Sequence, residues 1–222
     1  MAASPTPSTA APGPGAPLRL WGRMSSINVR KVTWMLQELQ HPFERIDAGA
    51  AFGIVDTPDY QRLNPNRLVP VLQHGAFTLW ESNTILRYLA QAFPAAGMLP
   101  ATPAERFRAE QWMDWQQTTA NPAGRDAFVQ WIRTPAEQRD AGRIARSEAA
   151  MQGVLQLLDA HLAHTPYVAG ARFSVADVPL GCELHRWTRL PVARPPMPHV
   201  DRWYAALLAR PATRGVLDQP LS

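Results

Sequence analysis

A stretch rich in proline and glycine divides this 222-residue chain into two parts with different patterns. Residues 94–103 hold three prolines and one glycine, residues that interrupt helices and strands and are typical of a linker. Before this stretch, short apolar runs alternate with helical spacing, whereas only helical spacing follows it. The chain is long enough for two modest domains. We therefore expect an α/β domain followed by an all-helical domain.

The part before the linker consists of two short units in succession. Apolar runs of strand length predict strands, and apolar residues three or four apart predict helices. A glycine-containing segment at 73–76 predicts a hairpin turn. The expected elements are, in chain order, strands at 18–21 and 43–46 with a helix from 28 to 39 between them, then strands at 69–72 and 77–80, and a helix from Ser82 that Pro94 ends. The order β-α-β followed by β-β-α is the thioredoxin-like arrangement.

The part after the linker carries sequence signals for helix starts. Thr102 is followed by Pro103 and Glu105, which is the pattern of a capping box with proline at the first helical position. Ser174 and Asp177 repeat the spacing with an aspartate in the glutamate position. Apolar stripes predict two further helices: Met151, Val154, Leu155, Leu158 and Leu162 in one, and Val200, Trp203, Tyr204, Leu207 and Leu208 in the other.

Composition excludes several classes of protein. The formal net charge is +4, and the basic residues are spread along the chain, which fits a solvated surface better than a nucleic-acid footprint. No apolar run reaches the ~18 residues of a membrane span. Cys182 is the one cysteine, so the chain has no internal disulfide. We expect no nucleic acid and no membrane among its partners.

The first residues of the chain differ from the rest in composition. Residues 1–17 are almost entirely alanine, proline, glycine, serine and threonine, which cannot bury enough apolar surface to order themselves. We therefore expect a disordered tail at 1–17, a thioredoxin-like domain at 18–94, a linker at 95–103 and an all-helical domain at 104–222.

Four motifs along the chain resemble those of the soluble glutathione transferases. They are LWGRMSSINVRKV at 20–32, NPNRLVP at 64–70, WESNTI at 80–85 and FSVAD at 173–177. Each motif alone is weak, but four in order at the family's spacing are specific, and the resemblance covers roughly residues 18–212. The first motif is similar to the catalytic loop of serine-type, bacterial and theta-like members. The resemblance implies a glutathione-binding domain followed by a domain for an apolar electrophile.

The chemistry implied by this resemblance is attack by the glutathione thiolate, with reduction of peroxides as a variant. An ordinary thiol has a pKa near ~8.5, so the enzyme must lower it. A hydroxyl that donates to sulfur and a nearby helix N-terminus both do so. Ser26 has the family spacing for this role, with Asn28 and Ser25 as further candidates. The alternative is that the two serines only cap the first helix.

The resemblance also implies residues that bind glutathione. Glu81 and Ser82 lie at a strand-to-helix corner, where a helix N-terminus suits the α-carboxylate of the γ-glutamyl end. Leu68, Val69 and Pro70 belong to the cis-proline segment, whose backbone pairs with the cysteinyl part. Arg67 is positioned for the glycyl carboxylate. The alternatives are that Ser82 only caps the helix and that Arg67 is a solvated loop residue.

The second substrate is expected to bind beside the helix that follows the linker. Trp112, Trp115, Gln116 and Thr119 recur there at helical spacing, although the tryptophans also fit a core stripe. The resemblance implies glutathione as co-substrate, no metal, a homodimer, a cytoplasmic location and a role in detoxification. Two alternatives stay open: a non-catalytic binding module of the same fold, and a zeta-like isomerase supported by the Ser25–Ser26 pair.

Overall fold

The computed structural model describes residues 12, 13 and 15–221. Most of the predicted disordered tail at 1–17 therefore lies outside the described residues. The chain divides into two compact units, which we call unit 1, up to Ala96, and unit 2, from Gly97 onward. Among the described residues, no helix is both long enough and apolar enough to cross a membrane.

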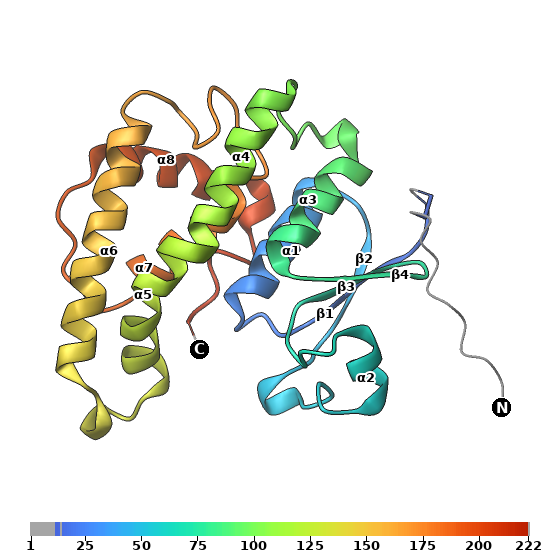
Figure 1. The fold of residues 1–222 in the computed structure, drawn as a ribbon, viewed down its shortest axis with the longest axis horizontal. Helices are drawn as coiled ribbons and strands as arrows, with labels where there is room; N and C mark the ends of the chain where they lie inside the picture. The colour runs from blue at the N-terminus through green and yellow to red at the C-terminus, as the bar shows by residue number, and fades with distance from the viewer. Residues whose placement is uncertain (1–11, 14, 222) are drawn as a thin grey trace. The chain divides into compact units, whose positions relative to one another are not determined.

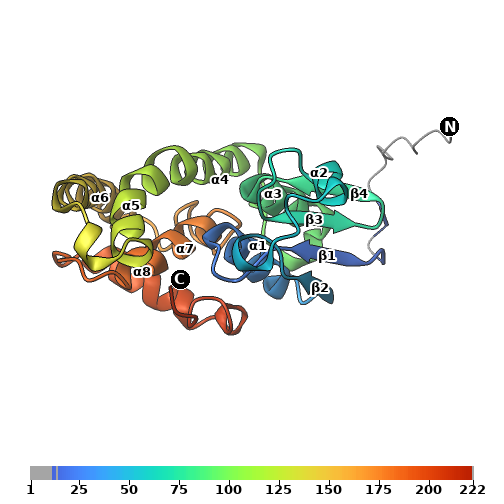
Figure 2. The same ribbon diagram turned by 90° about the horizontal axis from the view of Figure 1, so that it is seen from below.

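Unit 1 is built around a four-stranded mixed sheet. The strands β1 (Leu18–Trp21), β2 (Phe43–Ile46), β3 (Val71–His74) and β4 (Phe77–Trp80) lie in the order β2-β1-β3-β4, as Figure 2 shows. β1 pairs with β2 in parallel and with β3 antiparallel, and β3 pairs antiparallel with β4. This topology confirms the predicted thioredoxin-like arrangement.

The third strand starts two residues later than the sequence pattern predicts. The Val69–Pro70 peptide bond is cis, and proline has no N–H for the strand ladder, so β3 begins at Val71. The predicted turn at 73–76 is shorter, because Gln73 and His74 belong to the strand. Both polar side chains have partners: the Trp21 indole donates to Gln73 at 2.7 Å, and His74 Nδ1 lies 2.7 Å from the Tyr88 hydroxyl.

Helices cover both faces of this sheet (Figure 1). α1 (Ile27–Glu38) and α3 (Ser82–Ala92) pack against one another on one face, and α2 (Pro58–Leu63) lies on the other. Short 3-10 turns, η1 (Ala50–Phe52) and η2 (Pro94–Ala96), complete unit 1. Successive side chains of β1 point to opposite faces of the sheet, and both faces are covered. Leu18 and Leu20 are buried, and Trp21 meets Tyr60 of α2 edge to face at 6.0 Å.

Unit 2 is built from helices, as predicted. In chain order these are α4 (Pro103–Trp115), the π-helical turn η3 (Gln116–Ala120), α5 (Asn121–Phe128), the π-helical turn η4 (Val129–Arg133), η5 (Ala136–Gln138), α6 (Ala141–Leu162), α7 (Asp177–Thr188), α8 (Pro198–Leu208) and η6 (Pro211–Thr213). The predicted apolar stripe of α6 is buried. In α8, Val200, Trp203 and Leu207 are buried while Leu208 is exposed.

Of the two predicted capping boxes, the first is complete and the second is partial. At α4, Thr102 and Glu105 form a complete capping box. Near α7, the Ser174 N–H donates to Asp177 at 2.9 Å, as a capping box requires. The Ser174 hydroxyl accepts from the Ala176 N–H rather than from Asp177, because α7 itself begins only at Asp177.

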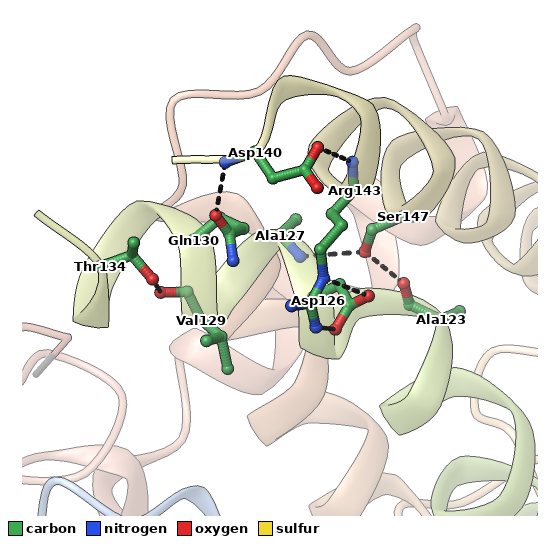
Figure 3. A network of polar contacts seen from close by, with 9 residues as sticks. All are labelled: Ala123, Asp126, Ala127, Val129, Gln130, Thr134, Asp140, Arg143 and Ser147. Atoms are coloured by element: carbon green, nitrogen blue, oxygen red, sulfur yellow. Dashed lines mark hydrogen bonds and ion pairs between the residues drawn. The ribbon is translucent and has the colours of Figure 1, made fainter. Parts of the chain in front are cut away.

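Buried and surface polar contacts fix α5 against α6 (Figure 3). The Ser147 hydroxyl of α6 donates to the Ala123 carbonyl and accepts from the Ala127 N–H at 3.1 Å. On the surface of the pair, Arg143 donates to Asp126 at 2.8 Å. A small hydroxyl facing α5 therefore lets the two helix backbones approach closely.

Candidate functional site

Segments that follow or precede all four strands meet at one end of the sheet in unit 1. Trp21, the last residue of β1, is paired with Ile46 at the end of β2 and with Val71 at the start of β3. Val71 is in turn paired with Trp80 at the end of β4. The loop before α1, the Val69–Pro70 bond and the Glu81–Ser82 corner therefore lie side by side, and these are the segments that the sequence motifs mark.

The loop between β1 and α1 is held from several sides. The Gly22 N–H donates to the Ile46 carbonyl at 2.8 Å, and Arg45 donates to the Gly22 carbonyl at 2.9 Å. At the other end of the loop, Arg30 Nε donates to the Met24 carbonyl at 2.7 Å. Gly22 has a φ of +149°, and a Cβ there would lie 2.4 Å from a methyl of Val29. Glycine at this position is therefore required by both conformation and space.

Ser26 stands at the N-cap position of α1 but does not cap it with its side chain. Its backbone is extended, with φ −90° and ψ 122°, and its hydroxyl makes no capping hydrogen bond. The first turn of α1 has no acidic residue, so the partial positive charge of the helix N-terminus is not neutralised there. The hydroxyl is thus available to donate to an anion.

Ser25 and Asn28 flank Ser26 and are half-buried. Among the described residues, neither side chain has a hydrogen-bond partner. The structure therefore brings all three predicted donor residues together at one helix start.

The segment before β3 presents free backbone groups. In the part of the chain that is described, the N–H and C=O of Val69 have no hydrogen-bond partner. The preceding residue is fixed, because the Leu68 carbonyl accepts from the Tyr60 hydroxyl at 2.8 Å and from the Asn64 amide at 2.9 Å. Burial raises the pKa of Tyr60 to about 12, which keeps its hydroxyl protonated as a donor. Pro70 follows in the cis configuration, as the resemblance implied.

The Glu81–Ser82 corner places a second helix N-terminus at the same end of the sheet. Glu81 occupies the N-cap of α3 with a φ of 70°, a left-handed conformation that is uncommon outside glycine. Ser82 is 4% exposed and is the first residue of the helix. Its hydroxyl has no hydrogen-bond partner among the described residues, so it is not used as a cap. Both groups suit an amino-acid ligand, one as an anion and one as a donor.

Arg67 and Leu68 lie at the outside of this site. Arg67 has a φ of 55°, is exposed, and its Nη1 lies 3.5 Å from Asp56 Oδ1. Leu68 is 63% exposed. Arg67 is therefore already engaged with a carboxylate, although exposed ion pairs of this kind exchange easily.

The four residues expected beside the second substrate lie in α4 and η3 but differ in environment. Trp112 and Trp115 are half-buried and meet edge to face at 5.1 Å, and Trp112 also packs against His161 at 4.5 Å. Gln116 is fully buried and donates to Glu183 at 3.0 Å. Thr119 is exposed. The tryptophans thus have an accessible edge, whereas the Gln116 amide is engaged inside unit 2.

Two further features of the site bear on its chemistry. Among the described residues, no group of three or more histidine, cysteine, aspartate or glutamate side chains could hold a metal ion. Sequence reasoning missed Tyr60 and Arg45, which fix the backbone of the site from α2 and β2. No local pattern points to them, since each holds a backbone carbonyl outside its own helix or strand.

The comparisons with known proteins agree with this geometry. Residues 16–91 match the N-terminal domain of glutathione S-transferases, and residues 141–206 match their C-terminal domain. Glutathione S-transferase GstB of Escherichia coli (strain K12) is 39% identical over 92% of this chain and 100% of its own length. Glutathione S-transferase 3 of Zea mays is 33% identical over 89% of this chain and 91% of its own length.

A solved structure provides the corresponding comparison in three dimensions. The theta class glutathione S-transferase from the citrus canker pathogen Xanthomonas axonopodis pv. citri, with glutathione bound, superposes with a TM-score of 0.89. It is 43% identical and covers 93% of this chain and 100% of that chain. With both domain types matched in order and the site residues gathered at one sheet end, this chain belongs to the glutathione S-transferase family.

Proposed function

We propose that this glutathione S-transferase binds glutathione across the strand ends of unit 1 and activates its thiol with Ser26. The supporting observation is the Ser26 hydroxyl itself: it lies at the N-terminus of α1 and makes no capping bond. A hydroxyl that served only the helix would be bonded to the first turn.

Each part of the tripeptide has a chemically matched group. The Ser82 N–H and hydroxyl receive the α-carboxylate of the γ-glutamyl end, and Glu81 receives its α-ammonium. The N–H and C=O of Val69 pair with the cysteinyl backbone like an added strand, with Leu68 and Pro70 shaping that segment. Arg67 exchanges Asp56 for the glycyl carboxylate.

This arrangement lowers the pKa of the bound thiol. A free thiol has a pKa near ~8.5, and both a donated hydrogen bond from Ser26 and the α1 N-terminus favour the thiolate. Asn28 and Ser25 are neighbouring donors. The thiolate then attacks an electrophilic carbon, so that a carbon–sulfur bond forms and the leaving group departs with its electron pair.

Reduction of a peroxide is a variant of the same chemistry. The thiolate attacks one peroxide oxygen, and an alcohol leaves after it takes up a proton. A second glutathione then displaces water from the oxidised sulfur, which gives the disulfide of glutathione. This variant needs only the activated thiol and a second molecule of glutathione, so the residues proposed above supply what it requires.

Kinetics of single variants test the role of Ser26. Ser26→Ala is expected to lower kcat/KM for a chloronitrobenzene electrophile about 10- to 100-fold at pH 7, the usual effect of losing a hydrogen bond to a charged group. Ser25→Ala, a matched change one residue away, and Asn28→Ala are expected to lose less. If either of these variants loses more than Ser26→Ala, the assignment to Ser26 is wrong.

We also propose roles for the remaining parts of the chain. Residues 18–94 bind glutathione, 95–103 act as the linker, and 104–222 bind the electrophile, with Trp112 and Trp115 as apolar walls and Gln116 and Thr119 near them. The two half-buried tryptophans support this because ligand sites favour aromatic walls. Exchange of the aromatic residues is expected to change which electrophile is preferred.

A homodimer and a cytoplasmic location complete the proposal. Unit 1 exposes Leu68 at 63% and unit 2 exposes Phe107 at 72%, and large exposed apolar side chains suit an interface between subunits. Light scattering of the purified protein tests the dimer, because a monomeric mass would exclude it. The cytoplasm holds the glutathione pool that such an enzyme draws on, and cell fractionation tests that location.

A further inference from the structure

We propose that Arg23, in the loop before α1, binds the glycyl carboxylate of glutathione together with Arg67 and is the principal cation of the pair. This inference rests on the proposed function, because it assumes that glutathione lies across the strand ends of unit 1. It adds a residue to which the sequence motifs assigned no role and assigns it one atom group of the ligand.

The Arg23 guanidinium lies next to Gly49 in space. A Cβ built on Gly49 would lie 2.8 Å from Arg23 Nη1, 3.5 Å from a methyl of Val69 and 3.7 Å from a methyl of Val55. The guanidinium therefore lies against the segment that follows β2, close to the residue that pairs with the cysteinyl part. Gly49 has a φ of +81°, so glycine both permits this backbone and leaves the space that Arg23 fills.

The strand order indicates which end of the tripeptide reaches Arg23. The sheet runs β2-β1-β3-β4, so the Glu81–Ser82 corner after β4 and Gly49 after β2 lie at opposite sides of the same sheet end. Val69, before β3, lies between them. A tripeptide with its γ-glutamyl end at Ser82 and its cysteinyl part at Val69 therefore continues toward β2, and its glycyl carboxylate arrives where the Arg23 guanidinium stands.

Near the end of β2, Arg23 differs from the other described arginines Arg45 and Arg67, because both of these have a carboxylate partner. Arg45 is paired with Asp47 and donates to the Gly22 carbonyl, and the exposed Arg67 lies 3.5 Å from Asp56.

Arg23 is half-buried, and in the described part of the chain its side chain has no ion pair and no hydrogen bond. A carboxylate binds more favourably to a partly buried guanidinium than to an exposed guanidinium. The partly buried group has less bound water to displace and less side-chain freedom to lose on binding.

The experiment compares glutathione with its glycinamide analogue, in which a neutral amide replaces the glycyl carboxylate. Binding is measured by calorimetry for the wild type, Arg23→Ala, Arg23→Lys and Arg67→Ala. We expect the wild type to bind glutathione about 10- to 100-fold more tightly than the analogue, the usual range for a hydrogen-bonded charge. Arg23→Ala is expected to weaken glutathione binding by this factor and to leave binding of the analogue unchanged. Arg23→Lys, which keeps the charge, recovers part of the loss, and Arg67→Ala loses less than Arg23→Ala.

Several results would overturn the proposal. Equal losses for both ligands in Arg23→Ala would mean that Arg23 only shapes the loop, and a larger loss in Arg67→Ala would assign the carboxylate to Arg67. If the thiol of glutathione has a higher pKa when bound to Arg23→Ala than when bound to the wild type, the guanidinium stabilises the thiolate instead. If Arg23→Ala fails to fold, a wild type that binds both ligands equally still refutes the idea. Failure of the proposed function is distinct, since the wild type would then not bind glutathione.

Discussion

Removal of the Asp177 carboxyl group is expected to destabilise unit 2 in a way that depends on pH. Asp177 is fully buried. Its oxygens accept from the Val168 N–H at 3.0 Å, the Ser174 N–H at 2.9 Å and the Trp203 indole at 2.9 Å, and from the Ser174 hydroxyl at 3.3 Å. Asp177→Ala leaves three buried N–H donors without an acceptor, since the hydroxyl can rotate to another partner.

The magnitude follows from two opposing contributions. Each orphaned donor costs about 1–3 kcal/mol, or about 6 kcal/mol for three. Burial, opposed by the four hydrogen bonds, raises the pKa of Asp177 to about 6. At pH 7 the wild type therefore bears a cost of ionisation that the variant lacks, about 3 kcal/mol for a rise of about two pH units. The net loss of unfolding free energy at pH 7 is about 3 kcal/mol.

The sign of the pH effect follows from the raised pKa of Asp177. The folded-state pKa of about 6 lies above the unfolded value of about 4, so this group contributes its full stability below about pH 4 and loses it as the pH rises through about 6. The gap in stability between the wild type and Asp177→Ala is therefore expected to widen as the pH falls from 7 toward 4.

Urea unfolding followed by circular dichroism at pH 7 and pH 5 measures this gap, with transitions of the two units fitted separately. Asp126→Ala, which removes a half-exposed carboxylate paired with Arg143 in the same unit, serves as the matched control and should cost less than about 1 kcal/mol. A stability gap between the wild type and Asp177→Ala that narrows at pH 5, or a loss at pH 7 no larger than in the control, would show that the Asp177 carboxyl group does not stabilise unit 2 in this way.

Three further variants test the loop before α1, the start of α8 and the expected second-substrate residues. Gly22→Ala places a methyl 2.4 Å from Val29, so it should lower the melting temperature and the affinity for glutathione together; calorimetry showing neither change would contradict this. Asp159→Ala removes the acceptor for two backbone N–H groups at the start of α8 and should cost about 1–2 kcal/mol in urea unfolding, whereas an unchanged midpoint would show that water replaces it. Trp115→Ala should change the ratio of kcat/KM between bulky and small electrophiles while the pKa of the bound thiol stays the same; a shifted thiol pKa would place Trp115 at the glutathione site instead.

Much of the fold could be predicted because local pattern and tertiary structure agree. The strands at 18–21, 43–46 and 77–80 have the predicted bounds. β3 was misplaced because Gln73 and His74 look like turn residues in sequence, yet each makes a hydrogen bond to a side chain outside its strand, to Trp21 and to Tyr88. The π-helical turns η3 and η4 interrupt the helices of unit 2 without a distinct sequence signal, because apolar spacing does not reveal which carbonyl an N–H reaches.

The sequence predicts which residues belong to the candidate site, but not which hydrogen bonds their side chains make. Serine at a helix start is compatible with both a cap and a free donor, and only the structure shows that the Ser26 side chain makes no capping hydrogen bond. Gln116 has the helical spacing expected of a residue beside the second substrate but donates to Glu183, 67 residues away. Arg23 lies within the first motif, but the motif assigns it no role, because its placement against Gly49 is a long-range contact. Such long-range contacts leave no local trace in a single sequence.

Titration of the thiol of bound glutathione shows whether Ser26 lowers the pKa of that thiol. The ultraviolet absorbance of the thiolate is followed against pH in complexes of the wild type and of Ser26→Ala. We expect a pKa well below ~8.5 in the wild type and a value raised toward ~8.5 in the variant, with affinity for glutathione nearly intact. An unshifted thiol in the wild type, or an equally low pKa in Ser26→Ala, would contradict the role proposed for Ser26.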